Sequence, residues 1–169
     1  PNDKIIVVNN AVPNFPLHNK KELRQKLGIP SDKFVVGSIG RLAPEKDFGT
    51  IIKTAHYLRR IDKQVCFLII GGGPMANELI NLINDLNISE VVKITGWRSD
   101  ARDVLQACDL YINTSIREAF GNALVEAALC SLPVIAPAID GIPEVVEHNH
   151  TGLLITPTDP VNKYKSKDF

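Results

Sequence analysis

The sequence predicts an α/β domain built on a doubly wound parallel sheet. Short apolar runs rich in β-branched residues alternate along the chain with stretches of helical spacing. These runs are apolar throughout rather than at every second residue, which is typical of strands covered by helices on both faces. The seven expected strands are residues 5–8, 34–39, 65–70, 92–95, 110–113, 134–136 and 153–155.

The stretches between the strands have the 3.6-residue period of amphipathic helices. Leu23 and Leu27 mark a helix that begins after Asn19 and ends at Gly28, with Pro30 beyond it. The six expected helices are residues 20–28, 48–58, 79–86, 100–108, 122–130 and 143–147.

Composition excludes several classes of protein. Nineteen Lys and Arg balance nineteen Asp and Glu, so the chain lacks the basic surface of a nucleic-acid binder or a polybasic membrane anchor. No apolar run reaches the roughly 20 residues that span a membrane. Cys66, Cys108 and Cys130 lie in or beside apolar segments, with no CxxC pair. We therefore expect a single cytoplasmic domain with reduced thiols.

Ligands of doubly wound sheets bind beyond the carboxyl ends of the strands, so the loops there are the candidate site. In the first such loop, Gly40 permits a sharp turn, and Arg41 and Lys46 follow before a helix that Asp47 is placed to cap. Two cations of different geometry suit a diphosphate. Two solvated surface charges are an equally good interpretation of this spacing.

The second loop matches the G-x-G-x-x-[G/A] pattern of a dinucleotide fold at Gly71, Gly73 and Ala76. A dinucleotide site also needs an acidic residue at the end of the next strand, whereas the first acid there is Asp100. Glycines at such a corner are more often needed for close backbone packing.

The third loop covers residues 96–100. Ser99 or Asp100 is placed to cap the following helix, which is the simpler interpretation. Trp97, the single tryptophan, is also placed to stack on an aromatic base.

The fourth loop carries the most specific pattern, in which Glu118 and Glu126 are separated by seven residues. Backbone N–H groups from Gly121 to Ala123 form a helix start suited to phosphate. Glu126 lies on an otherwise apolar helix, where a buried carboxylate needs a partner or a ligand. A simple exposed position for Glu126 is the alternative.

Taken in order, these loops resemble the C-terminal domain of the family 4 glycosyltransferases, which are retaining enzymes of the GT-B fold with Rossmann-like domains. The resemblance runs from about residue 5 to residue 160. It is carried by Asn9-Asn10-Ala11-Val12-Pro13, Gly40-Arg41-Leu42-Ala43-Pro44-Glu45-Lys46-Asp47, Ile69-Ile70-Gly71-Gly72-Gly73-Pro74, Ile94-Thr95-Gly96, Glu118-Ala119-Phe120-Gly121 through Glu126, Pro133-Val134-Ile135-Ala136, Asp140-Gly141-Ile142-Pro143-Glu144 and Thr151-Gly152-Leu153.

The resemblance implies a UDP-, GDP- or ADP-sugar as donor, no cofactor and no metal, so His148 and His150 are expected to be loop residues. It implies that Arg41 and Lys46 neutralise the diphosphate, that Glu126 binds the ribose and that Glu118 lies by the donor sugar. It assigns catalysis to Glu118, Arg41 and Lys46. The full donor-binding set is Gly40, Arg41, Lys46, Gly71, Gly72, Gly96, Trp97, Arg98, Glu118, Ala119, Phe120, Gly121, Asn122, Ala123, Leu124 and Glu126.

The same resemblance implies a domain organisation. We expect residues 1–160 to form the nucleotide-sugar-binding domain and residues 161–169 to be a polar tail. The N-terminal domain, which brings the acceptor (a glycan, a lipid or a small molecule), is expected to be missing. We therefore expect this chain to bind donor without turnover, and the full-length enzyme to be peripheral to a membrane.

Three other functions stay open at this point. A nucleotide-sugar 2-epimerase of the same fold would isomerise the sugar instead of transferring it. A non-catalytic module would only bind a nucleotide sugar. A nicotinamide-dependent dehydrogenase depends on Gly71 and Gly73 alone.

Overall fold

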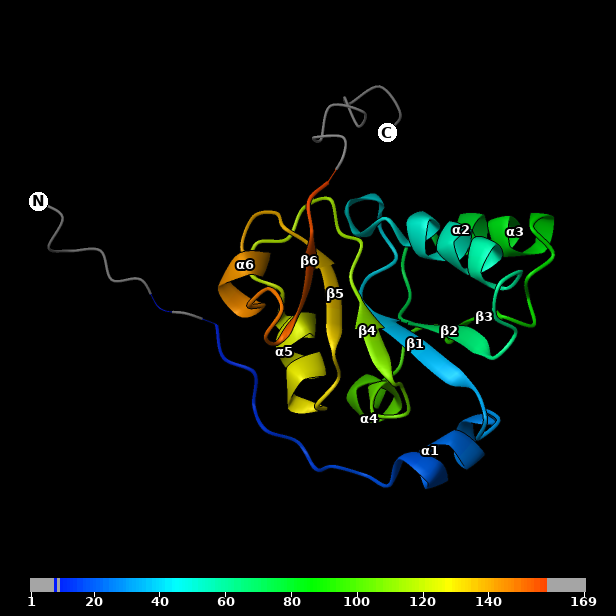
Figure 1. The fold of residues 1–169 in the computed structure, drawn as a ribbon, viewed down its shortest axis with the longest axis horizontal. Coiled ribbons are helices and arrows are strands. Elements are labelled where there is room, and N and C mark those ends of the chain that lie inside the picture. Colours follow the sequence, from blue (N-terminus) through cyan, green and yellow to red (C-terminus); the bar gives the residue numbers. More distant parts are fainter. Residues whose placement is uncertain (1–7, 9, 158–169) are drawn as a thin grey trace, which may run out of the picture.

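The computed structural model describes residue 8 and residues 10–157. Six parallel strands form one sheet in the order β3-β2-β1-β4-β5-β6 (Figure 1). The order of the strands reverses between β1 and β4, which makes their carboxyl ends the topological switch point of the sheet. The strands are Phe34–Ile39 (β1), Val65–Ile70 (β2), Val92–Ile94 (β3), Leu110–Ile112 (β4), Val134–Pro137 (β5) and Gly152–Ile155 (β6).

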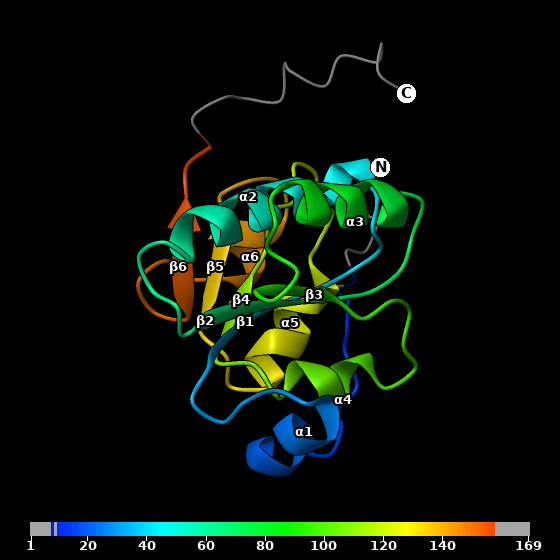
Figure 2. The same cartoon turned by 90° about the vertical axis from the view of Figure 1, so that its right-hand side faces the viewer.

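Helices cover both faces of the sheet (Figure 2). Helices α2 and α3 pack on one face, and α1, α4 and α5 lie on the other. The helices are Lys20–Leu27 (α1), Phe48–Leu58 (α2), Ala76–Asp85 (α3), Ala101–Leu105 (α4), Asn122–Leu129 (α5) and Ile142–Val145 (α6), with a 3₁₀ turn at Pro44–Lys46. Successive residues Val35 and Val36 enter the two separate cores, as expected for a strand that is buried on both faces.

The predicted fold class is confirmed, and six of the seven expected strands form. The expected strand at residues 5–8 lies outside the described residues except for Val8, which is exposed and outside any strand. Two helices are shorter than expected: α4 ends at Leu105 and α6 at Val145. The polar tail, residues 161–169, also lies outside the described residues.

Local signals for helix ends are confirmed where a cap was expected at α1 and α2. The Asn19 side chain accepts hydrogen bonds from two N–H groups of the first turn of α1, and Gly28 ends that helix with φ 67°. The Asp47 carboxylate accepts from the N–H and the hydroxyl of Thr50 at the start of α2.

A buried ion pair fixes α1 to the sheet at the amino ends of its strands. Arg24 is 7% exposed, and its guanidinium bonds the carbonyls of Ala107 and Lys33 and the carboxylate of Asp109. The Asp109 carboxylate also accepts from the Val35 N–H at 2.8 Å. Burial alone raises the pKa of Asp109, but this N–H and the neighbouring cations outweigh it and hold the pKa below its usual value.

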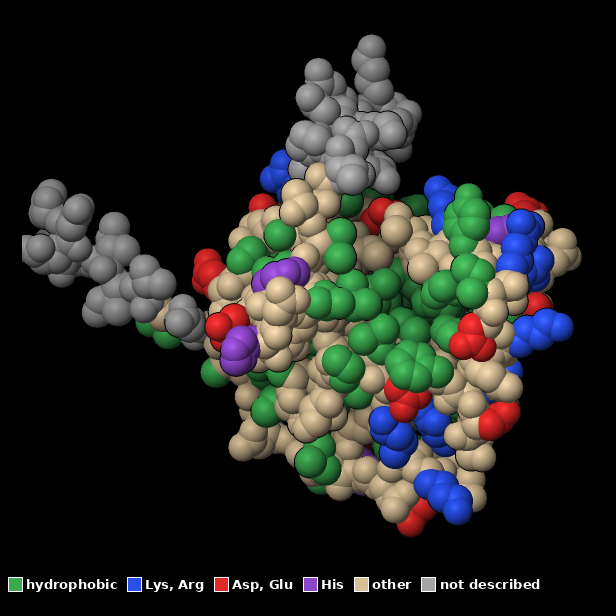
Figure 3. Space-filling view, viewed as in Figure 1, with side chains coloured by type: hydrophobic (Ala, Val, Ile, Leu, Met, Phe, Trp, Pro, Cys, Tyr) green, Lys and Arg blue, Asp and Glu red, His purple; other side chains and the backbone are tan. Residues whose placement is uncertain are grey.

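Part of the sheet has no helix over it among the described residues. The register pairs Ile112 with Ile135, and Ile135 with Leu153, so these side chains share the face on which α2 and α3 pack. Leu153 and Ile155 on the edge strand are 45% and 53% exposed. Figure 3 shows hydrophobic side chains gathered across this face, between α2 and β6. In the part of the chain that the structure describes, no helix is both long and apolar enough to cross a membrane.

Candidate functional site

The loops that follow β1 and β4 meet at the switch point of the sheet. The Ile116 N–H donates to the carbonyl of Glu45 at 2.9 Å, and the Thr114 hydroxyl bonds the carbonyls of Lys46 and Asp47 at 3.0 and 2.9 Å. These contacts join segments about 70 residues apart in sequence. The first and fourth predicted loops therefore form one site.

An ion pair between Lys46 and Glu118 lies at the centre of this site. Both side chains are largely buried, with 24% and 14% exposed, and the Ser115 hydroxyl lies 3.4 Å from the same carboxylate oxygen. The sequence predicted both residues as members of the site, and the structure brings them into direct contact. Lys46 and Glu118 neutralise each other in this pair. An anion that enters the site can replace the Glu118 carboxylate as the partner of Lys46.

Arg41, the second predicted cation, lies at the rim of the site. Its side chain is 67% exposed, and its guanidinium donates to the carboxylate of Glu45 at 2.7 Å. The Glu45 backbone N–H, and then Arg41, hold the pKa of the Glu45 carboxyl below its usual value. Lys46 is therefore inside the site, and Arg41 is paired at its mouth.

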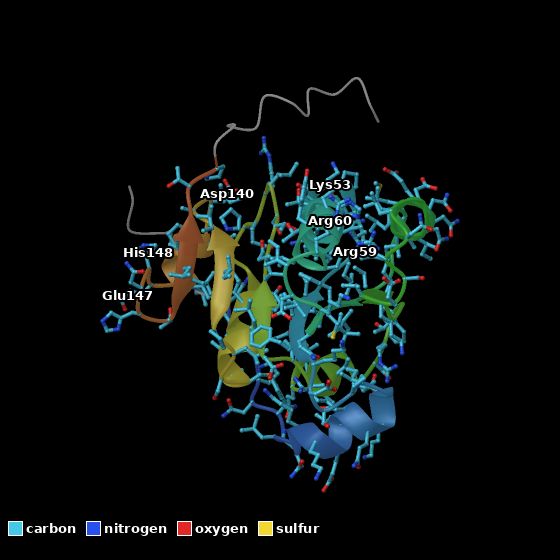
Figure 4. The ribbon with its side chains drawn as sticks, turned by 45° about the vertical axis from the view of Figure 1, so that its right-hand side comes forward. Lys53, Arg59, Arg60, Asp140, Glu147 and His148 are labelled. Carbon is cyan, nitrogen blue, oxygen red and sulfur yellow. The ribbon has the colours of Figure 1, made fainter. Side chains whose placement is uncertain are left out.

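The loop after β5 holds the backbone of Glu118. The Asp140 carboxylate accepts from the Glu118 N–H at 3.0 Å, and the Gly141 N–H donates to the Glu118 carbonyl at 3.1 Å. A Cβ on Gly141 would lie 2.2 Å from the Ala119 carbonyl oxygen, so only glycine allows this approach. Figure 4 shows Asp140 beyond the carboxyl end of β5. Sequence reasoning placed Asp140 in a motif without a role, because nothing local showed its contact with Glu118.

The start of α5 faces the same region. Gly121 precedes the helix with φ 96°, and the first N–H groups of α5 follow it. The Asn122 side chain accepts from Asn10 at 3.4 Å. Leu124, which was included in the predicted binding set, is 1% exposed in the core, and its N–H donates to the Gly121 carbonyl at 2.8 Å, so its side chain cannot contact a ligand.

Glu126 has a partner that the sequence analysis missed. Its side chain is 13% exposed, so the alternative of a simple exposed residue is wrong. The Nε of Arg102 on α4 donates to its Oε1 at 2.8 Å, and Arg102 also lies over the Phe15 ring, 5.7 Å from the ring centroid. A need for a partner at Glu126 was predicted, but the identity of that partner depends on how α4 packs beside α5.

The glycine-rich loop is explained by backbone packing. A Cβ on Gly71 would lie 1.9 Å from the Gly40 carbonyl oxygen, and one on Gly73 would lie 2.5 Å from the Leu42 carbonyl oxygen. The Gly71 N–H donates to the Gly96 carbonyl, and the Leu42 N–H donates to the Gly72 carbonyl. The G-x-G-x-x-A pattern therefore reflects contact between neighbouring loops.

The third loop is open to solvent. Trp97 is 80% exposed beside Gly72, in a position that leaves its ring available to a ligand. No side-chain hydrogen bond caps the start of α4, so the expectation of a cap by Ser99 or Asp100 is wrong. The Asp100 carboxylate instead accepts two hydrogen bonds from Arg98 at 2.7 and 2.6 Å, and this pairing lowers the pKa of Asp100 and raises that of Arg98. A bidentate arginine two residues away outcompetes the helix N–H groups for the carboxylate.

Other reactive side chains lie away from this site or are occupied. The Nδ1 of His148 accepts from the Leu154 N–H at 3.0 Å, and Figure 4 shows His148 beside β6. Within residues 8 and 10–157, no three His, Cys, Asp or Glu side chains are grouped as metal ligands. Burial raises the pKa of the thiols, to about 12 at Cys108 and about 11 at Cys130.

Comparison with known proteins decides the family. The family model for group 1 glycosyl transferases matches residues 19–164. The chain belongs to this family. The site at the β1/β4 switch point is therefore part of a group 1 glycosyltransferase domain, and its Rossmann-like sheet matches the C-terminal domain of GT-B enzymes, as the motifs predicted.

Named relatives are glycosyltransferases. The UDP-Gal:alpha-D-GlcNAc-diphosphoundecaprenol alpha-1,3-galactosyltransferase of Escherichia coli is 32% identical over 163 residues, which cover 92% of this chain and 42% of that protein. The D-inositol 3-phosphate glycosyltransferase of Stackebrandtia nassauensis is 31% identical and covers 90% of this chain and 38% of its own length. The chain thus spans about two fifths of these relatives.

Solved structures agree with the relatives. Anabaena Alr3699/HepE has been crystallised with UDP and with UDP-glucose; it is 36% identical, with a TM-score of 0.74 over 83% of this chain and 39% of its own. These matches favour the glycosyltransferase over the epimerase and over the non-catalytic module.

Proposed function

We propose that this domain binds a UDP-sugar at the β1/β4 switch point, and that the whole protein transfers the sugar to an acceptor hydroxyl with retention of configuration. The observation that carries the proposal is the largely buried Lys46–Glu118 pair, joined by the loops after β1 and β4. The choice of uracil as the base of the donor is supported by the UDP and UDP-glucose complexes of the Anabaena relative.

The cations and the carboxylate act on different parts of the donor. Lys46 turns from Glu118 to the diphosphate, and Arg41 joins it from the rim, so that both cations stabilise the charge that grows on the leaving group. The first N–H groups of α5 face the same phosphates. Glu126 accepts hydrogen bonds from the ribose hydroxyls.

Glu118 acts at the sugar once Lys46 has moved to the diphosphate. Backbone groups from Ala119 to Gly121 contact the same sugar, and residues 96–98 lie by the base, with Trp97 free to stack on it. Residues up to 160 constitute the donor half of the enzyme. No metal is required in this mechanism, because two cations serve the diphosphate.

The acceptor is bound by a part of the protein outside this chain, so the 169-residue chain binds donor and does not transfer sugar. The length of the relatives supports this division, since the chain spans only about two fifths of them. A glycan, lipid or small-molecule acceptor fits the relatives, one of which is named for a diphosphoundecaprenol acceptor. The proposal assigns the reaction to glycan synthesis in the cytoplasm. Such an acceptor would bring the full-length enzyme to a membrane surface.

A thermal-shift screen tests the proposal. The chain is heated with UDP, UDP-glucose, GDP, ADP and NAD, each at the same concentration. The proposal predicts a larger shift with UDP and UDP-glucose than with the others, because only bound ligand stabilises the folded state. A shift with NAD alone would favour the dehydrogenase and contradict the proposal.

A further inference from the structure

We infer that Arg102 is a positioning residue, which holds the Glu126 carboxylate in the orientation that the donor ribose needs, and that Phe15 in turn holds Arg102. The inference rests on the proposed function, in which Glu126 receives the ribose. It goes beyond that function by assigning roles to two residues outside the predicted binding set.

The contact between Arg102 and Glu126 uses only part of the carboxylate. The Nε of Arg102 donates to Oε1 at 2.8 Å. Among the residues that the structure describes, no side chain or backbone group donates to Oε2. A carboxylate that is held through one oxygen can still accept a hydrogen bond from a hydroxyl group through the other oxygen. The pair therefore leaves one carboxylate oxygen of Glu126 without a donor, in a position to accept a hydrogen bond from the ribose.

Arg102 is held on its other side by an aromatic ring. Its guanidinium carbon lies 5.7 Å from the centroid of the Phe15 ring, within the range of a cation–π contact. The Arg102 side chain is 38% exposed, so without such a contact its long stem would sample several rotamers. The ring and the carboxylate together restrict it to one position.

The residues that follow Phe15 are held by a buried amide at the C-terminal end of α4. Gln106 is 5% exposed; its Nε2 donates to the Pro16 carbonyl at 3.1 Å, and its Oε1 accepts from the His18 N–H at 2.7 Å. His18 also lies 3.3 Å from Asp103 of the same helix. The segment at residues 15–18 is thus bonded to the helix that carries Arg102. Gln106 thus bonds Pro16, the residue after Phe15, and the Phe15 ring contacts Arg102, which bonds Glu126.

Such an arrangement matters because a residue that binds a diol must be ordered before the ligand arrives. A carboxylate on a helix surface otherwise loses side-chain freedom on binding, and this loss weakens affinity. A purely structural role is the competing explanation, in which Arg102 only joins α4 to α5. That role would lower the free energy of unfolding without changing the preference for ribose over deoxyribose.

The test measures that preference by calorimetric titration of the 169-residue chain with UDP and with 2′-deoxy-UDP. The variants are Arg102→Met, Phe15→Leu, Glu126→Gln and the double variant of Arg102 and Glu126. Arg60→Met is the matched control, because Arg60 follows the C-terminal end of α2, whereas the first donor loop adjoins the N-terminal end of that helix. The ratio of the two dissociation constants cancels any loss of folded protein that affects both ligands equally.

The wild-type chain is expected to prefer UDP, and Glu126→Gln should reduce this preference about three- to tenfold, the range of one hydrogen bond. On a logarithmic scale, Arg102→Met should reduce the preference by at least half of the reduction caused by Glu126→Gln. Phe15→Leu should also reduce the preference, but by less than Arg102→Met does. The double variant should match Glu126→Gln alone, because Arg102 acts only through Glu126. Arg60→Met should leave the ratio unchanged.

Two results would overturn the inference, and they are distinguishable. If the wild type has no preference for UDP over 2′-deoxy-UDP, or if Glu126→Gln keeps the wild-type preference, the ribose assignment in the proposed function is wrong, and the role of Arg102 is wrong with it. If Glu126→Gln loses the preference while Arg102→Met keeps it, the proposed function stands and the positioning role is wrong. Should Arg102→Met fail to fold, Arg102→Leu, which also lacks an N–H donor, is judged by the same two outcomes.

Discussion

Replacing Lys46 by Ala is the most informative single perturbation of the donor site. In the absence of ligand, Lys46 is paired with Glu118, and both side chains are mostly buried. A charge-assisted hydrogen bond to the diphosphate contributes about 1.5–3 kcal/mol. Because Lys46 must first leave Glu118, part of that free energy is offset, and the net loss should lie near the lower limit. We expect a loss of about 1.5–2 kcal/mol, or about ten- to thirtyfold in the dissociation constant of UDP.

The assay is calorimetric titration with UDP and with uridine, which lacks the phosphates. Uridine affinity should change by less than about twofold, since Lys46 is assigned to the diphosphate alone. Lys26→Ala, an exposed lysine on α1, is the matched control and should leave both affinities unchanged. Equal losses of UDP and uridine affinity, or no loss of UDP affinity, would refute the assignment.

Three further predictions concern separate features. Glu118→Gln should leave the affinity for UDP unchanged or higher, because Lys46 is released from its ion pair, but should lower the affinity for UDP-glucose about tenfold. Equal losses of affinity for both ligands in calorimetry would contradict this prediction. Below about pH 4 the free energy of unfolding, measured by urea titration, should fall. The pKa of Asp109 is lower in the folded chain than in the unfolded chain, so its carboxylate stabilises the fold above the unfolded pKa, and this contribution is lost as the folded carboxylate is protonated. Asp109→Asn should lose less free energy of unfolding on acidification, and a loss equal to that of the wild type would contradict the assignment. The exposed apolar side chains of the uncovered face should make the chain self-associate, and Ile155→Lys, at a position that is 53% exposed there, should reduce this self-association in sedimentation experiments while changing the free energy of unfolding by less than about 1 kcal/mol. A wild type that stays monomeric, or equal self-association of both proteins, would contradict this prediction.

Local patterns predicted the helix ends and the strands well. Asn19, Gly28 and Asp47 act within a few residues of their own position, so their roles could be read from sequence spacing. Asp100 had the same signal but failed, because Arg98 competes for its carboxylate. The length of α4 was also overestimated, since its apolar period continues into the buried residues of the following turn.

Contacts between distant segments were beyond the reach of such patterns. Arg102 and Glu126 are 24 residues apart, and Lys46 and Glu118 are 72 apart. The sequence identified Lys46, Glu118 and Glu126 as candidates because each is a charged residue in an unusual position. It did not identify Arg102, which lies on a helix where an exposed arginine is ordinary. The partners of charged residues depend on packing between loops and helices.

A crystal structure of this chain with UDP tests the central claim most directly. We predict that the diphosphate lies within hydrogen-bond distance of the Lys46 ammonium group and faces the first N–H groups of α5, with the Lys46–Glu118 pair opened and the ribose on Glu126. UDP bound elsewhere, or bound at the switch point with the diphosphate out of reach of Lys46, would contradict the account.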